Sequence, residues 1–116
     1  MGRNVTAFLE AHQSSADPWQ CFGVFHLGRN HYVEVGDWSL DTGYCSCETQ
    51  EALTEDNKGT ARWSSYSEVR QAITESCINK EEEYMDFWQW EVIFSAMSEL
   101  ENSRAWIVRL VIVIDQ

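Results

Sequence analysis

The sequence predicts an α+β fold, in which a mostly antiparallel sheet is backed by two helices and the chain ends in a β-hairpin. One observation is a pair of runs rich in aromatic and β-branched residues, 87–94 and 106–114, as is typical of strands. The other is a pair of segments with apolar residues at helical spacing, 5–12 and 66–78. The 116 residues fit one domain, residues 1–116, that can bury its own core.

The elements of the first half follow from apolar patterning and turn residues. Val5, Phe8, Leu9 and His12 share one helical face, which predicts a short first helix. Two strands, 21–27 and 31–35, are joined by residues that tolerate positive φ, which indicates a hairpin. The remaining segments are predicted to be a third strand around 44–47, a polar loop with a helical turn at 48–59, and a short strand at 60–63.

A local signal predicts the second helix. Ser65 and Glu68 form a capping box, in which each side chain accepts a hydrogen bond from the other residue's backbone N–H. Apolar residues then recur at helical spacing up to residue 78, and Asn79 suits the left-handed position that ends a helix.

Residues 84–100 fit either a helix or a strand, and cross-strand pairing favours the strand. If 87–94 folds back on 106–113 with Glu91 opposite Arg109, aromatic and aliphatic residues also fall opposite one another. Trp88 then faces Ile112, for example. We therefore expect a terminal hairpin whose loop is 96–103.

One face of that hairpin has no predicted cover, because two helices would not cover both sides of the sheet. A homodimer that buries this face is the simplest solution. The alternative is a monomer in which residues 38–59 wrap the second face. The predicted dimer interface consists of Phe87, Ile93, Ile107, Val111 and Val113.

The charge of the chain limits its partners. Eight Lys plus Arg against 19 Asp plus Glu give a net charge of −11, and both halves of the chain are acidic. Nucleic-acid binding is not expected, because phosphate contacts require clustered cations. An acidic surface instead favours encounter with a cationic partner. The longest apolar run, 105–114, is too short for the ~20 residues of a membrane span, and no secretion signal opens the sequence, so we expect a cytoplasmic protein.

The sequence contains potential metal ligands and nucleophiles, but not in the arrangement that a metal site or an active site requires. His26, His31, Cys45 and Cys47 are metal ligands by type, but their spacing does not match a structural zinc site. A Cys–His nucleophile pair, with Asp37 or Asp41 orienting the ring, lacks a basic neighbour that would lower the thiol pKa. We therefore predict no metal, no cofactor and no catalytic residue.

Aromatic rings beside carboxylates are the ingredients of a site for cations. The chain has six Trp residues, most of which we expect in the core. The predicted residues for binding a partner or ligand are Tyr84, Asp86, Trp88, Trp90, Glu91, Asp37 and Asp41.

These observations predict a small, acidic, non-enzymatic binding protein. One form is an immunity or antitoxin-type inhibitor of a basic protein, whose carboxylates replace the phosphates that a nuclease expects. The alternative is a module that holds a cationic or aromatic small molecule against Trp and Glu side chains. In being short, acidic, aromatic-rich and free of motifs, the chain resembles hypothetical proteins of bacterial mobile gene cassettes of the integron type.

Overall fold

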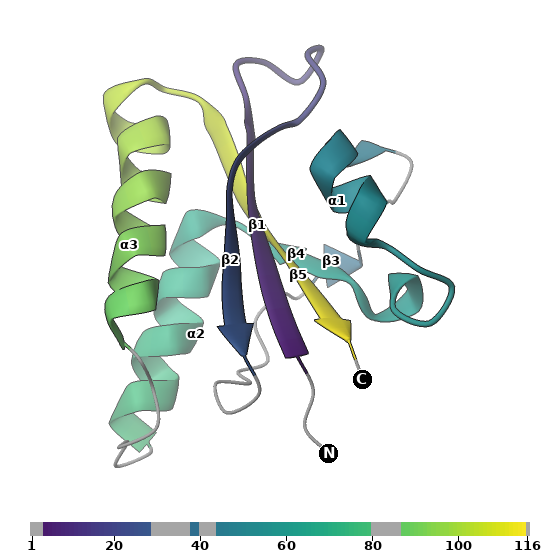
Figure 1. The fold of residues 1–116 in the computed structure, drawn as a ribbon. Helices are drawn as coiled ribbons and strands as arrows, with labels where there is room; N and C mark the ends of the chain where they lie inside the picture. The colour runs from purple at the N-terminus through teal and green to yellow at the C-terminus, as the bar shows by residue number, and fades with distance from the viewer. Residues whose placement is uncertain (1–3, 29–37, 40–43, 80–86, 116) are drawn as a thin grey trace.

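The computed structural model describes residues 4–28, 38–39, 44–79 and 87–115. Its centre is a five-stranded sheet with the strand order β2-β1-β5-β4-β3, and all pairs are antiparallel (Figure 1). The predicted α+β class is confirmed, as is a sheet backed by two helices. The elements are β1 (Asn4–His12), β2 (Gln20–Gly28), β3 (Trp38–Ser39), α1 (Cys47–Ala52), η2 (Lys58–Thr60), β4 (Arg62–Ser64), α2 (Tyr66–Asn79), α3 (Phe87–Ser98), η3 (Glu99–Ser103) and β5 (Ile107–Asp115).

Helices α2 and α3 lie side by side on one face of the sheet (Figure 1). Alternate residues of the two central strands point toward them, because side chains along a strand alternate between the faces of its sheet. Leu9 of β1 and Leu110 of β5 lie in this core with Ile73 of α2 and Ile93 of α3, and all four are fully buried.

The opposite face of the sheet is covered by a second, smaller cluster. Phe8 of β1 and Val111 and Val113 of β5 pack there with Cys45, Ala61 and residues at the end of α1. This packing agrees with the alternative in which residues 38–59 cover the second face. Both faces of β1 and of β5 are therefore buried, and β5 reads as an apolar run interrupted by Arg109.

The first predicted helix is wrong, because residues 4–12 form the strand β1 between β2 and β5. Val5, Leu9 and Phe8 fit a helical stripe in the sequence, but Phe8 points to the opposite face from the other two. One face of β1 is apolar at every second residue from Val5 to Ala11, and Phe8 is the apolar exception on the otherwise polar second face.

The predicted terminal hairpin is also wrong, because one of its two strands is a helix in the structure. Ile107–Asp115 is the strand β5, whereas Phe87–Ser98 is the helix α3. Strand β5 pairs with β1 and β4, so Arg109 lies opposite Glu10 and not Glu91. In α3, residues Trp90, Ile93 and Met97 recur at helical spacing and are buried, and this burial outweighs the strand preference of Trp, Val and Ile.

Shorter predictions had mixed outcomes. Strand 21–27 is confirmed as β2 and 60–63 as β4, shifted by one or two residues. The predicted strand at 44–47 is wrong, because Ser46 caps the N-terminus of α1. The loop at 48–59 contains most of α1 and the start of η2, and the predicted strand 31–35 lies outside the described residues.

The helix predicted at 66–78 is confirmed as α2, together with its capping box. The Glu68 N–H donates to Ser65 Oγ at 3.3 Å, and the Ser65 N–H donates to Glu68 Oε1 at 2.9 Å. Both backbone donors at the start of this helix are thereby satisfied.

Candidate functional site

The outward side of α3, continued by the first residue of η3, carries a row of exposed residues, which we call the α3 stripe: Trp88, Glu91, Val92, Ser95 and Glu99. These positions recur every three or four residues, so they lie above one another on one side of the helix. The opposite side holds the buried Trp90, Ile93 and Met97. Helix packing therefore fixes which side chains α3 presents to solvent.

Two large apolar side chains of the α3 stripe are exposed to water. The exposed fraction is 62% for Trp88 and 49% for Val92, which lies one turn further along the helix. Neighbouring exposed aromatic and aliphatic side chains are the composition of protein contact sites, where Trp is enriched. Glu91, which directly precedes Val92 and lies one turn from Trp88, adds a carboxylate to this surface.

A groove of about 590 Å³ runs between α2 and α3 along the α3 stripe. Tyr66 and Arg70 of α2 form one wall, and Glu91, Phe94 and Ser95 contribute to the other. The Tyr66 and Phe94 rings meet edge to face with their centroids 6.3 Å apart. The groove thus has an aromatic base and polar sides.

The charges along the groove differ in how they are paired. Arg70 Nη1 donates to the Tyr66 hydroxyl at 2.7 Å, and Glu99 lies 3.5 Å from Arg104 in an exposed ion pair. Glu91 forms no ion pair with any residue in the described parts of the chain. Its carboxylate is exposed to solvent one turn from the exposed Trp88.

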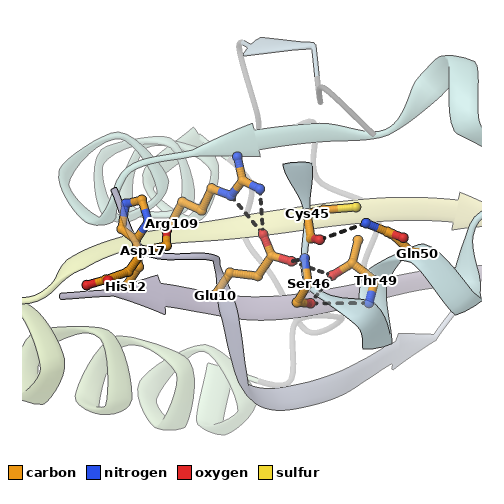
Figure 2. A network of polar contacts seen from close by, with 8 residues as sticks. All are labelled: Glu10, His12, Asp17, Cys45, Ser46, Thr49, Gln50 and Arg109. Carbon is orange, nitrogen blue, oxygen red and sulfur yellow. Dashed lines mark hydrogen bonds and ion pairs between the residues drawn. The ribbon is translucent and has the colours of Figure 1, made fainter. Parts of the chain in front are cut away.

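A buried polar network lies on the face of the sheet that is turned away from α2 and α3, next to the start of α1 (Figure 2). Arg109 Nε donates to Glu10 Oε1 at 2.8 Å, and Arg109 Nη2 lies 2.7 Å from the same oxygen as an ion-pair contact without hydrogen-bond geometry. The other carboxylate oxygen, Oε2, accepts hydrogen bonds from the Ser46 N–H and the Thr49 hydroxyl, both at 2.7 Å. Glu10 thereby joins β1, β5 and α1.

Aromatic rings enclose this network. The Arg109 guanidinium carbon lies 4.0 Å from the centre of the Trp19 ring and 5.8 Å from that of Trp63. His12 stacks on Trp19 at 3.7 Å and donates from Nδ1 to the Asp17 carbonyl oxygen at 2.9 Å. Glu10 and Arg109 are 0% and 6% exposed, so we assign the network a structural role.

The surroundings of Cys21 and Cys45 do not favour a nucleophilic thiolate. Burial raises the pKa of the Cys21 thiol and that of the Cys45 thiol, and the Glu10 carboxylate raises both further. A raised pKa lowers the fraction of thiolate, which is the reactive form. Cys45 and Cys47 flank the N-cap of α1 and do not share a strand face. In the described parts of the chain, no group of three His, Cys, Asp or Glu side chains is arranged to hold a metal ion.

The predicted binding residues are divided by the structure. Trp88 and Glu91 share the α3 stripe, but Trp90 is 2% exposed and belongs to the core. Tyr84, Asp86, Asp37 and Asp41 lie outside the described residues. Val92, Ser95 and the α2 wall were missed, although a helical interpretation of 87–100 places Val92 and Ser95 beside Trp88.

The predicted dimer interface is wrong in three of its members. Ile93, Val111 and Val113 are at most 1% exposed, because the chain itself covers both faces of its sheet. Ile107 is 46% exposed, and the Phe87 side chain lies outside the described residues. These residues do not form one surface for a second subunit.

Comparisons with profiles of protein families, with curated proteins and with solved structures gave no match. In the described part of the chain, no helix has the length and apolar character needed to cross a membrane.

Proposed function

We propose that this chain is a non-enzymatic binding protein that recognises a cationic protein through the α3 stripe. The observation that carries the proposal is an exposed Trp88 beside Glu91, a carboxylate without an ion pair in the described residues. A Lys or Arg side chain satisfies both groups at once, since it can lie over the indole face and pair with the carboxylate.

The remaining features of the surface suit the same partner. Val92 adds apolar contact area beside Trp88, and an aromatic anchor next to aliphatic area is the composition of a binding hot spot. The net charge of −11 attracts a basic protein over longer distances and raises its association rate. Affinity then comes from the α3 stripe and encounter rate from the whole acidic surface.

An immunity or antitoxin-type inhibitor of a basic toxin fits this chemistry, acting in the cytoplasm and encoded in a mobile gene cassette. Carboxylates would occupy the phosphate-binding surface of the toxin. We therefore expect a gene for a basic protein to lie beside this one, and the product of that gene is the partner to test.

The experiment is a calorimetric titration of this chain with the basic protein encoded by the neighbouring gene. We expect Trp88→Ala and Glu91→Gln each to weaken binding about tenfold or more, as at hot spots. Glu51→Gln is the matched control, because it removes the same charge from α1 on the other face of the sheet. Equal effects of Glu91→Gln and Glu51→Gln would show that only net charge matters and would contradict the proposed site.

A small cationic ligand is the second candidate, because the exposed Trp88 ring and the Glu91 carboxylate could also hold an organic cation. Titration with arginine amide, followed by Trp fluorescence, tests this candidate. A response that Trp88→Ala abolishes would support the small ligand, and no response at any concentration would contradict it.

A further inference from the structure

The groove between α2 and α3 carries opposite charges on its two walls, and every residue that lines it is described. Arg70 belongs to the α2 wall and Glu91 to the α3 wall, and both side chains are exposed. The two helices run in opposite directions, and Tyr66 contacts Phe94 across the groove (Figure 1). Arg70 follows Tyr66 by one turn, and Glu91 precedes Phe94 by one turn. In antiparallel helices these steps lead to the same level, so the two charges lie across the groove from each other.

These opposite charges do not pair with each other, because none of the ion pairs among the described residues joins Arg70 to Glu91. Arg70 Nη1 instead donates to the Tyr66 hydroxyl at 2.7 Å, and the guanidinium carbon lies 5.8 Å from the centre of the same ring. Tyr66 thereby holds the guanidinium at the α2 wall. A guanidinium has five N–H donors, so this bond leaves a fork of donors for a carboxylate. The Tyr66 hydroxyl accepts from Arg70, which leaves its own proton to be donated to the same carboxylate.

The space between the two charges has an aromatic base. The Tyr66 and Phe94 rings meet there edge to face, and Phe94 also lies against the buried Trp90, with the ring centroids 6.0 Å apart. An apolar side chain that lies on these rings would be withdrawn from water, which is favourable. Ser95 and Ser98 line the α3 wall beside the base. The groove therefore combines a group for a carboxylate, a group for an ammonium ion and an apolar surface.

We propose that this groove binds a free α-amino acid with an apolar side chain. Arg70 and the Tyr66 hydroxyl hold its carboxylate, and Glu91 holds its ammonium group. The side chain of the amino acid lies on the Tyr66 and Phe94 rings. A ligand with a single charge would satisfy one wall and leave the charge of the other wall without a partner. The inference goes beyond the proposed function, because only Glu91 belongs to both sites and Trp88 does not line the groove.

The test is an NMR titration of the ¹⁵N-labelled protein with L-phenylalanine and two matched analogues. N-acetyl-L-phenylalanine lacks the ammonium group, and L-phenylalanine amide lacks the carboxylate. The titration is run at slightly acidic pH, where the amino group of the amide keeps its proton. We expect L-phenylalanine to shift the amides of Ser95 and Ser98 saturably, and each analogue to bind at least about fivefold more weakly. No saturable shift with L-phenylalanine, or equal affinity for the three compounds, would overturn the proposal.

Variants assign each charge of the groove to one group of the ligand. Arg70→Gln should weaken binding of L-phenylalanine but not of its amide, because the amide has no carboxylate to lose. Glu91→Gln should weaken binding of L-phenylalanine but not of the N-acetyl compound. Lys58→Gln is the control, because it removes one positive charge from η2, outside the groove. Equal effects of Arg70→Gln and Lys58→Gln on L-phenylalanine would contradict the assigned site.

Trp88→Ala separates this site from the α3 stripe. The substitution should weaken binding of a basic protein, as the proposed function requires, and leave the affinity for L-phenylalanine unchanged. Loss of L-phenylalanine binding in Trp88→Ala would place the amino acid at Trp88 and overturn the proposal. Either site can therefore fail without the other.

Discussion

Glu10 and Arg109 face each other in the register of β1 and β5, and both are withdrawn from water. Burying two charges is costly, and the loss is offset only when hydrogen bonds satisfy their remaining atoms. Ser46 and Thr49 satisfy one oxygen of Glu10, and the Trp19 ring covers the guanidinium. The pair therefore links the sheet to the segment that covers its second face.

Substituting Glu10→Gln should lower the free energy of unfolding by about 3 kcal/mol or more, because Arg109 would remain buried without a counter-charge. Urea unfolding measures the loss. The control is Glu55→Gln, which breaks the exposed ion pair with Lys58 and should cost less than about 1 kcal/mol. A small effect of Glu10→Gln, similar to that of the control, would show that water reaches the pair.

The raised pKa values of Cys21 and Cys45 predict how stability depends on pH. In the folded chain both thiols keep their protons to higher pH than in the unfolded chain, mainly because they are buried. Their contribution to stability is therefore complete below the ordinary thiol pKa of about 8.5, and it is lost as the pH rises toward the raised values.

The measurement is the free energy of unfolding between neutral and alkaline pH, for wild type and for a Cys21→Ala, Cys45→Ala double variant. Comparing the slopes removes the constant cost of the substitutions. Wild type should lose stability more steeply with rising pH than the variant. Parallel curves would contradict the assignment.

At the scale of elements, the capping box of α2 combines a local sequence signal with an observed geometry. Ser65→Ala removes the acceptor of the Glu68 N–H and should destabilise the protein by about 1 kcal/mol. Thr74→Ala, at an exposed position in the interior of the same helix, is the control and should leave stability unchanged or raise it slightly. Thermal unfolding followed by far-UV circular dichroism compares them, and equal melting temperatures of the two variants would contradict a capping role.

Elements set by local chemistry could be predicted from the sequence, and elements set by packing could not. Ser65 and Glu68 define the start of α2 without help from distant residues. Residues 4–12 were misassigned because Phe8 interrupts the alternation of β1 and completes a helical stripe, and its burial on the second face depends on packing. Residues 87–98 were misassigned because Trp90 and Ile93 prefer strands yet pack as a helical face.

The candidate site, like the fold, could be predicted only where neighbouring residues in the sequence define it. An aromatic ring beside a carboxylate identified Trp88 and Glu91, although the prediction placed them on a strand. The α2 wall, with Tyr66 and Arg70, requires knowing that two helices pack together. That contact joins residues far apart in the sequence, and no local pattern encodes it.

At the scale of the whole molecule, the acidity is spread widely, so charge alone does not locate a binding site. Exposed carboxylates also occur on α1, where Glu48 and Glu51 point to solvent. The α3 stripe differs from α1 because an exposed Trp and Val accompany its carboxylate. We therefore expect cationic ligands to bind at α3 in preference to α1.

The most direct test is an NMR titration of the ¹⁵N-labelled protein with an arginine-rich peptide. We expect the largest shifts on the Trp88 indole N–H and on the amides around Glu91 and Val92. Glu91→Gln should reduce these shifts, and Glu51→Gln should leave them unchanged. Shifts that are largest on α1, or that are spread evenly over all acidic segments, would contradict the claim that the α3 stripe is the binding site.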